Sequence, residues 1–292
     1  MTALASKQES DGKGYDRPPT PIGQFLRLTS TRVYLAVLAL MAAFSFLGPF
    51  FVPSPINTDF PVLLPPQLGH PAGTDFLGRD FLAQLMVGGQ VSLFVGLAVG
   101  VICLTLAVVV GGLAGFFGGF LDQALSKISE FFQVIPAIIL ALVAVSMLGA
   151  NLPIVILILS LTMWPQVARI VRAECMRVSQ LGYVESSKAA GFSPVRILWS
   201  DVLPNAFAPV LVATTMTVGR AILVESGLAF LGLGDADRPS WGALLNSAQS
   251  YIQTAWWLTL LPGFAIFVVV LSANMLGDRL NDSLNPSLSK VK

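Results

Sequence analysis

The chain has 292 residues, of which 54% are hydrophobic and 11% are charged, whereas a soluble domain carries roughly 25% charged residues. This composition excludes an ordinary soluble enzyme and predicts an all-α, polytopic integral membrane protein. The net charge of +1 gives no reason to expect a nucleic-acid partner.

Long uncharged runs along the chain predict six transmembrane helices. The runs lack the alternation of apolar and polar residues that the strands of a membrane barrel need, so helices are the expected spanning structure. The helices are expected over residues 33–52, 91–116, 129–148, 152–171, 206–227 and 256–276. The chain then divides into a tail (1–32), a first span (33–52), an external segment (53–90), a core (91–276) and a second tail (277–292).

The placement of positive charge predicts the orientation. With the N-terminus in the cytoplasm, only Arg79 and Arg238 of the 17 Lys and Arg residues fall outside, and Arg220 falls within a span. Cytoplasmic loops carry the excess of Lys and Arg. Both termini are therefore expected in the cytoplasm, and the first tail is expected to be disordered up to about Pro21.

The external segment is rich in proline, which denies it a long regular helix. Within it, "RDFLAQLM" places Phe81, Leu82, Leu85 and Met86 on one helical face. That pattern predicts a short helix lying in the membrane interface.

Small residues at four-residue spacing follow in the second span and at its exit. They predict close approach of another helix backbone. The residues are Gly96, Gly100, Gly111, Gly115 and Gly119. Pro136 and Pro165 further along predict local kinks.

A polar stretch over 183–204 separates the fourth and fifth spans. Tyr183 to Ala190 can form about two turns of helix, Gly191 offers a turn, and Ser193 followed by Pro194 is a good helix start. The second helix is expected to end near Leu203 and Pro204. A docking element for a soluble partner and a plain surface hairpin are the two interpretations.

This hairpin resembles the EAA motif of ABC importer permeases, in which Glu-Ala-Ala is followed by a glycine and, further on, by Leu-Pro. The two alanines are serines here, and Asp201 stands where the family usually has an apolar residue. The resemblance implies a coupling helix that docks on an ATPase. The implied coupling residues are Glu185, Ser186, Ser187, Lys188, Ala189, Ala190, Gly191, Phe192, Leu203 and Pro204.

Other segments are similar to the dipeptide, oligopeptide and nickel branch of these permeases. They include "HPAGTDFLGRDFLAQLMVGGQVSL", "WPQVARIVRAE", "ESGLAFLGLG" and "NMLGDRLNDSLNP", the last departing from the branch at Arg279, Asn281 and Asn285. The resemblance implies a type I ABC importer permease fold in a bacterial inner membrane. Implied partners are a homologous second permease, two cytoplasmic ABC ATPases, an extracytoplasmic solute-binding protein and membrane lipid.

Signatures of chemistry are missing from the sequence. There is no G-x-x-x-x-G-K-[ST] loop to cradle phosphate, and the sole histidine, His70, has no neighbours in the sequence that would complete a metal site. No catalytic residue, metal site or cofactor is expected in this chain. By resemblance, ATP and Mg would be bound by the partner ATPases.

Arg220 and Glu225 are the ionisable residues expected inside a span. Charges there favour a transport pathway, with Arg220 meeting a substrate carboxylate and Glu225 near an ammonium group, whereas the alternative for Arg220 is snorkelling to the outer interface. The pair lies about 140° apart on a helix, so an ion pair between them is poor.

Two other features keep two interpretations each. Arg169 and Arg172, at the inner border of a span, would contact lipid head groups or an ATPase. The external stretch "GLAFLGLGDADRPSWG" would be a re-entrant loop or outer gate, or else an ordinary scaffold loop.

The expected function is ATP-driven import of dipeptides, oligopeptides or a related small solute, with this chain forming half of the pathway. An ion-coupled secondary transporter and a membrane assembly scaffold are the alternatives. The small number of ionisable groups within the spans weakens the first alternative.

Overall fold

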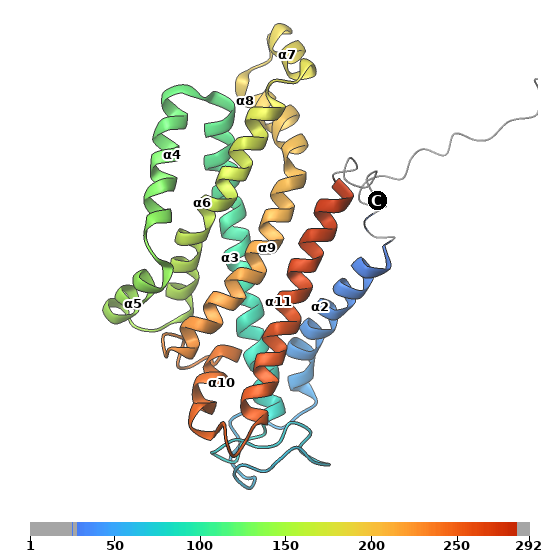
Figure 1. The fold of residues 1–292 in the computed structure, drawn as a ribbon, viewed down its shortest axis with the longest axis vertical. Coiled ribbons are helices and arrows are strands. Elements are labelled where there is room, and N and C mark those ends of the chain that lie inside the picture. Colours follow the sequence, from blue (N-terminus) through green and yellow to red (C-terminus); the bar gives the residue numbers. More distant parts are fainter. Residues whose placement is uncertain (1–24, 26–27, 285–292) are drawn as a thin grey trace, which may run out of the picture.

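The computed structural model describes residue 25 and residues 28–284. These residues form an elongated bundle of helices, with α7 at one end and the segment between α2 and α3 at the other (Figure 1). Most of both tails, and with them the expected disorder up to Pro21, lies outside the described residues. The α-helices are α2 (Thr29–Leu47), α3 (Phe81–Phe117), α4 (Gly119–Val134), α5 (Ala137–Leu148), α6 (Leu152–Val178), α7 (Gly182–Ala189), α8 (Pro194–Ile197), α9 (Leu203–Phe230), α10 (Trp241–Ala248) and α11 (Trp257–Leu284).

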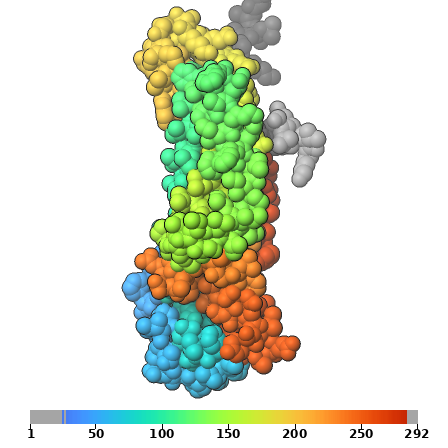
Figure 2. All heavy atoms as spheres, turned by 90° about the vertical axis from the view of Figure 1, so that its left-hand side faces the viewer, coloured from blue at the N-terminus to red at the C-terminus, as the bar shows by residue number. Residues whose placement is uncertain are grey.

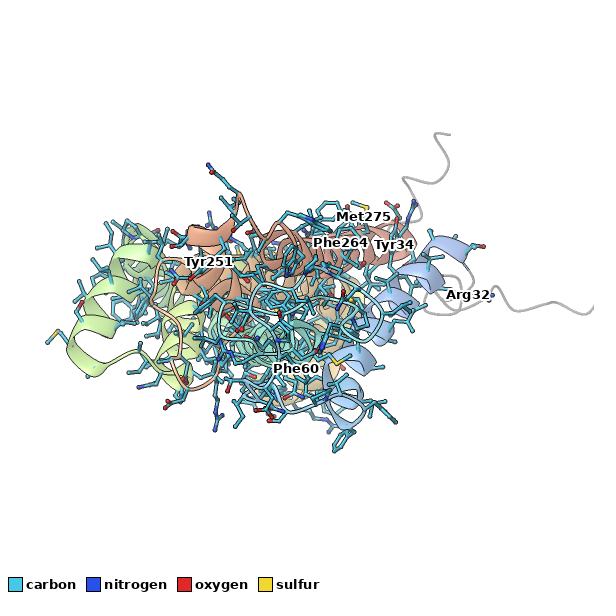
Figure 3. All side chains as sticks on the ribbon, turned by 90° about the horizontal axis from the view of Figure 1, so that it is seen from below. Arg32, Tyr34, Phe60, Tyr251, Phe264 and Met275 are labelled. Atoms are coloured by element: carbon cyan, nitrogen blue, oxygen red, sulfur yellow. The ribbon has the colours of Figure 1, made fainter. Side chains whose placement is uncertain are left out.

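The predicted membrane architecture is confirmed. Within the described residues, five helical segments are each long and apolar enough to cross a membrane, and a sixth span results if α4 and α5 count as one. Seen from below, α4 and α5 (green) and α2 (blue) lie on opposite sides of the bundle (Figure 3).

The helix predicted over 129–148 starts earlier, at Gly119, and is broken at Pro136, where a local kink was predicted. α4 and α5 meet at an angle of 78°, with Ile135 in an extended conformation (φ −80°, ψ 117°). Pro136 causes the break because its ring disfavours the helical conformation of the residue before it and it has no amide hydrogen to donate.

The predicted interfacial helix is also wrong, because "RDFLAQLM" belongs to the first turns of α3. The Asp80 side chain caps α3 by accepting a hydrogen bond from the Ala83 amide (3.0 Å). Phe81 and Leu85 are buried in a cluster with Trp241 and Trp257, so their apolar face packs on protein rather than on lipid. The segment between α2 and α3 therefore ends at Asp80.

The second helix of the hairpin does not end at Leu203 and Pro204. α8, a π-helical turn (η2, Leu198–Val202) and α9 run on as one helical segment, Pro194–Phe230. Pro204 donates no backbone hydrogen bond, and the wider π turn lies just before it. The side-chain NH₂ group of Asn205 donates to the Asp201 carbonyl oxygen (2.7 Å).

Two glycine pairs in α3, Gly96 with Gly100 and Gly111 with Gly115, allow close helix packing as predicted. A Cβ atom at Gly111 or Gly115 would overlap a backbone carbonyl oxygen of α6, and one at Gly96 or Gly100 would crowd side chains of α9. Gly119 differs, because nothing lies within 4 Å of its added Cβ and its φ is +58°. It begins α4 rather than packing a helix pair.

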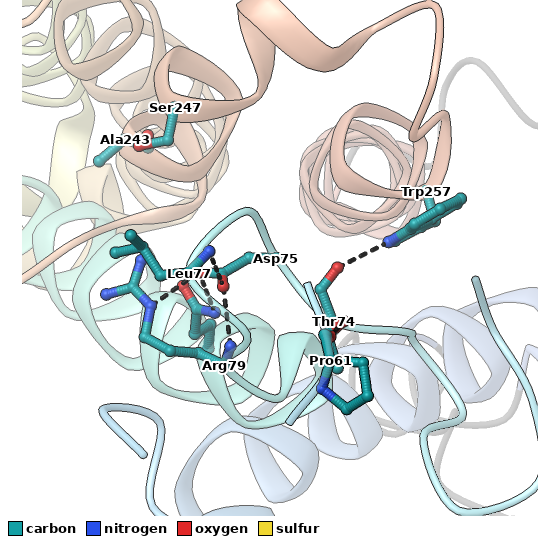
Figure 4. Close-up of polar contacts among 9 residues, drawn as sticks. Pro61, Thr74, Asp75, Leu77, Arg79, Ala243, Ser247 and Trp257 are labelled. Atoms are coloured by element: carbon teal, nitrogen blue, oxygen red, sulfur yellow. Dashed lines mark hydrogen bonds and ion pairs between the residues drawn. The ribbon is translucent and has the colours of Figure 1, made fainter. Parts of the chain in front are cut away.

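The segment between α2 and α3 is tied to the bundle by polar contacts (Figure 4). The Thr74 carbonyl accepts a hydrogen bond from the Trp257 indole (3.2 Å). The buried Asp75 carboxylate accepts hydrogen bonds from the side chains of Arg79 (2.7 Å) and Gln84 (2.9 Å). These contacts fix the segment over the ends of α3 and α11.

Candidate functional site

The predicted hairpin is present and forms the outermost projection at its end of the molecule (Figures 1 and 2). α7 covers eight residues, Gly191 turns the chain with a φ of +79°, and the Ser193 hydroxyl caps α8 by accepting from the Arg196 amide (3.4 Å). The residues implied in coupling lie mostly at the surface. The exposed ones are Glu185, Ser186, Lys188, Ala189, Ala190, Gly191, Phe192 and Pro204, while Ser187 is half-buried and Leu203 is buried.

A few contacts hold α7 on the bundle. Val184 is fully buried in the main core cluster. The Lys188 ammonium lies 5.9 Å from the ring centroid of Phe116 at the end of α3, and the Tyr183 hydroxyl donates to the Asp201 carbonyl in η2 (3.3 Å). α7 is therefore connected to α3 and to the start of α9, while its outer face stays free.

Arg220 lines an open cavity of about 250 Å³. Its guanidinium donates a hydrogen bond to the Gln166 side-chain oxygen on α6. The cavity lies against the break between α4 and α5. Its lining residues are Gln133, Ile135, Pro136, Ala137, Thr162, Met163, Gln166, Arg220 and Val224.

Glu225 lies in a different place. It is buried, with its carboxylate near the hydroxyl groups of Ser92 (3.4 Å) and Ser226 (3.3 Å), and it is not among the residues that line the Arg220 cavity. The Ser92 hydroxyl also accepts from the Trp241 amide (3.3 Å). These hydrogen bonds link α3, α9 and α10 at Glu225. A role of Glu225 in the transport pathway stays a prediction.

The stretch "GLAFLGLGDADRPSWG" runs from the end of α9 into α10, which packs on the other helices. Trp241 is fully buried and its indole donates to the Leu85 carbonyl (2.8 Å). A Cβ atom at Gly242 would overlap the backbone of Ser226. The start of α10 is therefore packed against α3 and α9, whereas the connecting residues 231–239 are exposed or half-buried.

The contacts between α4 and α6 were not predicted from the sequence. Arg172 binds the Asp122 carboxylate through two nitrogens, one of them at 2.6 Å, and Arg169 donates to the Gln133 side-chain oxygen. The two arginines therefore meet a neighbouring helix rather than only head groups or an ATPase. The partners lie 50 and 36 residues apart in the sequence, so no local pattern points to them.

Comparisons with known proteins agree with this architecture. Residues 107–290 match the family described as binding-protein-dependent transport system inner membrane component. The chain is 37% identical over 263 residues to the nickel transport system permease protein of Escherichia coli (strain K12), covering 89% of this chain and 95% of that protein. It is 33% identical over 286 residues to a dipeptide transport system permease protein of Haemophilus influenzae, covering 94% and 97%.

A solved structure shares the fold. The inward-facing MetNI methionine ABC transporter aligns with a TM-score of 0.59 and 22% identity, over 70% of this chain and 97% of the matched chain. The fold is thus that of an ABC importer permease. Together with the family match over residues 107–290, the similarity over most of the chain to two permeases shows that this protein belongs to the binding-protein-dependent transport system inner membrane components.

Proposed function

We propose that this chain is a permease subunit that drives import of dipeptides, oligopeptides or a related small solute with the energy of ATP hydrolysed by partner subunits. The observation that carries the proposal is the exposed hairpin around α7 at one end of a membrane bundle, in a chain of this family. The chain itself supplies pathway walls and a docking helix. Nucleotide and Mg belong to the partners.

The contacts of α7 supply a physical route for coupling. A force on its outer face would reach α9 through the Tyr183–Asp201 hydrogen bond and through the short turn at Gly191, because α8, η2 and α9 are one helical segment. It would also reach the end of α3 through Lys188 and Phe116. Helices that are packed and continuous move as units, so motion of an ATPase would tilt α9 and α3 together.

The proposed partners are a homologous second permease, two cytoplasmic ABC ATPases and an extracytoplasmic solute-binding protein. The solute is proposed as a peptide because a relative at 33% identity is a dipeptide permease. A nickel permease at 37% identity makes a metal complex the competing solute. Both termini are proposed to lie in the cytoplasm, on the side of α7, because Lys and Arg gather there.

Site-specific photo-cross-linking of the complex tests docking and orientation together. A photoreactive residue at Ala190, which is exposed beside the Gly191 turn, is expected to capture an ATPase subunit. The matched control is Leu68, which is fully exposed in the external segment at the opposite end and is expected to capture no ATPase. ATPase adducts from Leu68, or none from Ala190 in an intact complex, would contradict the proposal.

A further inference from the structure

The cavity beside Arg220 has a polar wall that the predicted pathway charge alone does not explain. Two glutamines line it, namely Gln133 near the end of α4 and Gln166 on α6. Each glutamine accepts a hydrogen bond from an arginine through its side-chain oxygen, Gln133 from Arg169 and Gln166 from Arg220.

The arginines fix which way the two amides face. A guanidinium only donates hydrogen bonds, so it must meet the oxygen of a glutamine and not its NH₂ group. The oxygens of Gln133 and Gln166 are thereby engaged, and the NH₂ groups are the parts that stay available as donors. The Thr162 hydroxyl, also in the lining, donates to the backbone carbonyls of Ile158 (3.0 Å) and Leu159 (3.1 Å).

The charges around the cavity also favour an anionic ligand. Among the described residues that line the cavity, Arg220 is the one that carries a charge. Within the described part of the chain, neither Arg169 nor Arg220 forms an ion pair with a carboxylate, in contrast to Arg172 with Asp122. Arg220 is exposed within the open cavity, and a positive charge without a counterion there attracts an anion, more strongly the less water surrounds the two.

We propose that this cavity is an anion subsite, in which Arg220 and the NH₂ groups of Gln133 and Gln166 receive the carboxylate of the transported solute. A carboxylate presents only acceptors and fits a cavity whose free polar groups are donors. Arg169 acts as a positioning residue, since it orients the Gln133 amide. The identity of the ligand as a peptide carboxylate rests on the proposed function, whereas the preference for anions does not.

The preference for anions can be measured without transport. Val224 lines the cavity four residues after Arg220 on the same helical face. In the assembled transporter carrying Val224→Cys, a negatively charged methanethiosulfonate reagent is expected to react about tenfold faster than a positively charged one of similar size, relative to a free thiol. Arg220→Gln removes the positive charge and Gln166→Glu neutralises it with a carboxylate, so both should abolish that preference. Arg220→Lys keeps the charge and should keep the preference.

The controls separate the cavity from the protein's general charge. Leu68→Cys, fully exposed in the external segment, should show no preference that depends on Arg220, and the chain without an added cysteine reports labelling of Cys103 and Cys175, both buried. Equal rates for the two reagents at Val224→Cys in the parent protein would overturn the anion subsite.

The ligand class is tested by protection of the same cysteine. A dipeptide with a free carboxylate should slow labelling of Val224→Cys, and its C-terminal amide should not, with the difference lost in Arg220→Gln. Equal protection by both peptides would overturn carboxylate recognition. Peptide import by the parent transporter is a separate measurement. If no peptide is imported while the reagent preference persists, the proposed function is wrong and the anion subsite stands.

Discussion

Replacing Gly191 by tryptophan is expected to loosen the ATPases by about 5- to 30-fold while the permease stays in the membrane. Gly191 has a φ of +79°, and a left-handed conformation costs a side-chain-bearing L-residue about 1–2 kcal/mol, which corresponds to that change in affinity. Nothing lies within 4 Å of a Cβ added there. The penalty is therefore local backbone strain, relieved by reorienting the short α7.

The measurement is the amount of ATPase that co-purifies with the variant, together with substrate-stimulated hydrolysis. Gly191→Asn is the matched control, because asparagine tolerates the left-handed conformation and should keep both near the parent values. If Gly191→Trp retains full ATPase and full stimulation, the hairpin is an ordinary linker.

Alanine at Gly111 or Gly115 is expected to destabilise the folded subunit, unlike alanine at a helical glycine with open space around it. The added Cβ atoms would overlap the carbonyl oxygens of Ala168 and Arg172, which belong to the backbone of α6. A side chain can rotate away, but a backbone can yield only if α3 and α6 move apart. Overpacking of this kind costs about 1–3 kcal/mol per site.

Thermal unfolding of the purified subunit in detergent measures this effect. Gly263→Ala in α11 makes the same chemical change where nothing lies within 4 Å of the new Cβ, so its unfolding midpoint should match or exceed that of the parent, because alanine favours a helix over glycine. Midpoints for Gly111→Ala and Gly115→Ala that equal that of Gly263→Ala would contradict the close α3–α6 contact.

Features that depend on local sequence were predictable. Uncharged apolar runs predicted five of the spans, and the sixth if α4 and α5 count as one, because a lipid core demands long apolar helices. Gly191, Ser193 and Pro194 gave the hairpin, because turn and capping preferences act over a few residues. Pro136 was recognised as a kink, but its 78° bend was not, since the angle depends on what the two halves pack against.

Features that depend on distant residues were not predictable from one sequence. The apolar face of "RDFLAQLM" suits lipid or protein equally, and only the fold places Phe81 and Leu85 beside Trp241. Gln166 lies 54 residues from Arg220. In the sequence it is a single polar residue in a largely apolar run, so nothing indicates its partner. The burial of Glu225 against Ser92 depends on a contact across 133 residues.

Uptake by reconstituted vesicles tests the central claim of ATP-driven import most directly. Vesicles holding the complete complex, with ATP enclosed and with the binding protein and a labelled dipeptide outside, are compared with vesicles that carry a proton or sodium gradient and no ATP. We expect accumulation of the dipeptide that requires both enclosed ATP and the binding protein, and no accumulation from either gradient alone. Gradient-driven uptake by vesicles that contain only this chain would contradict the account and identify an ion-coupled transporter.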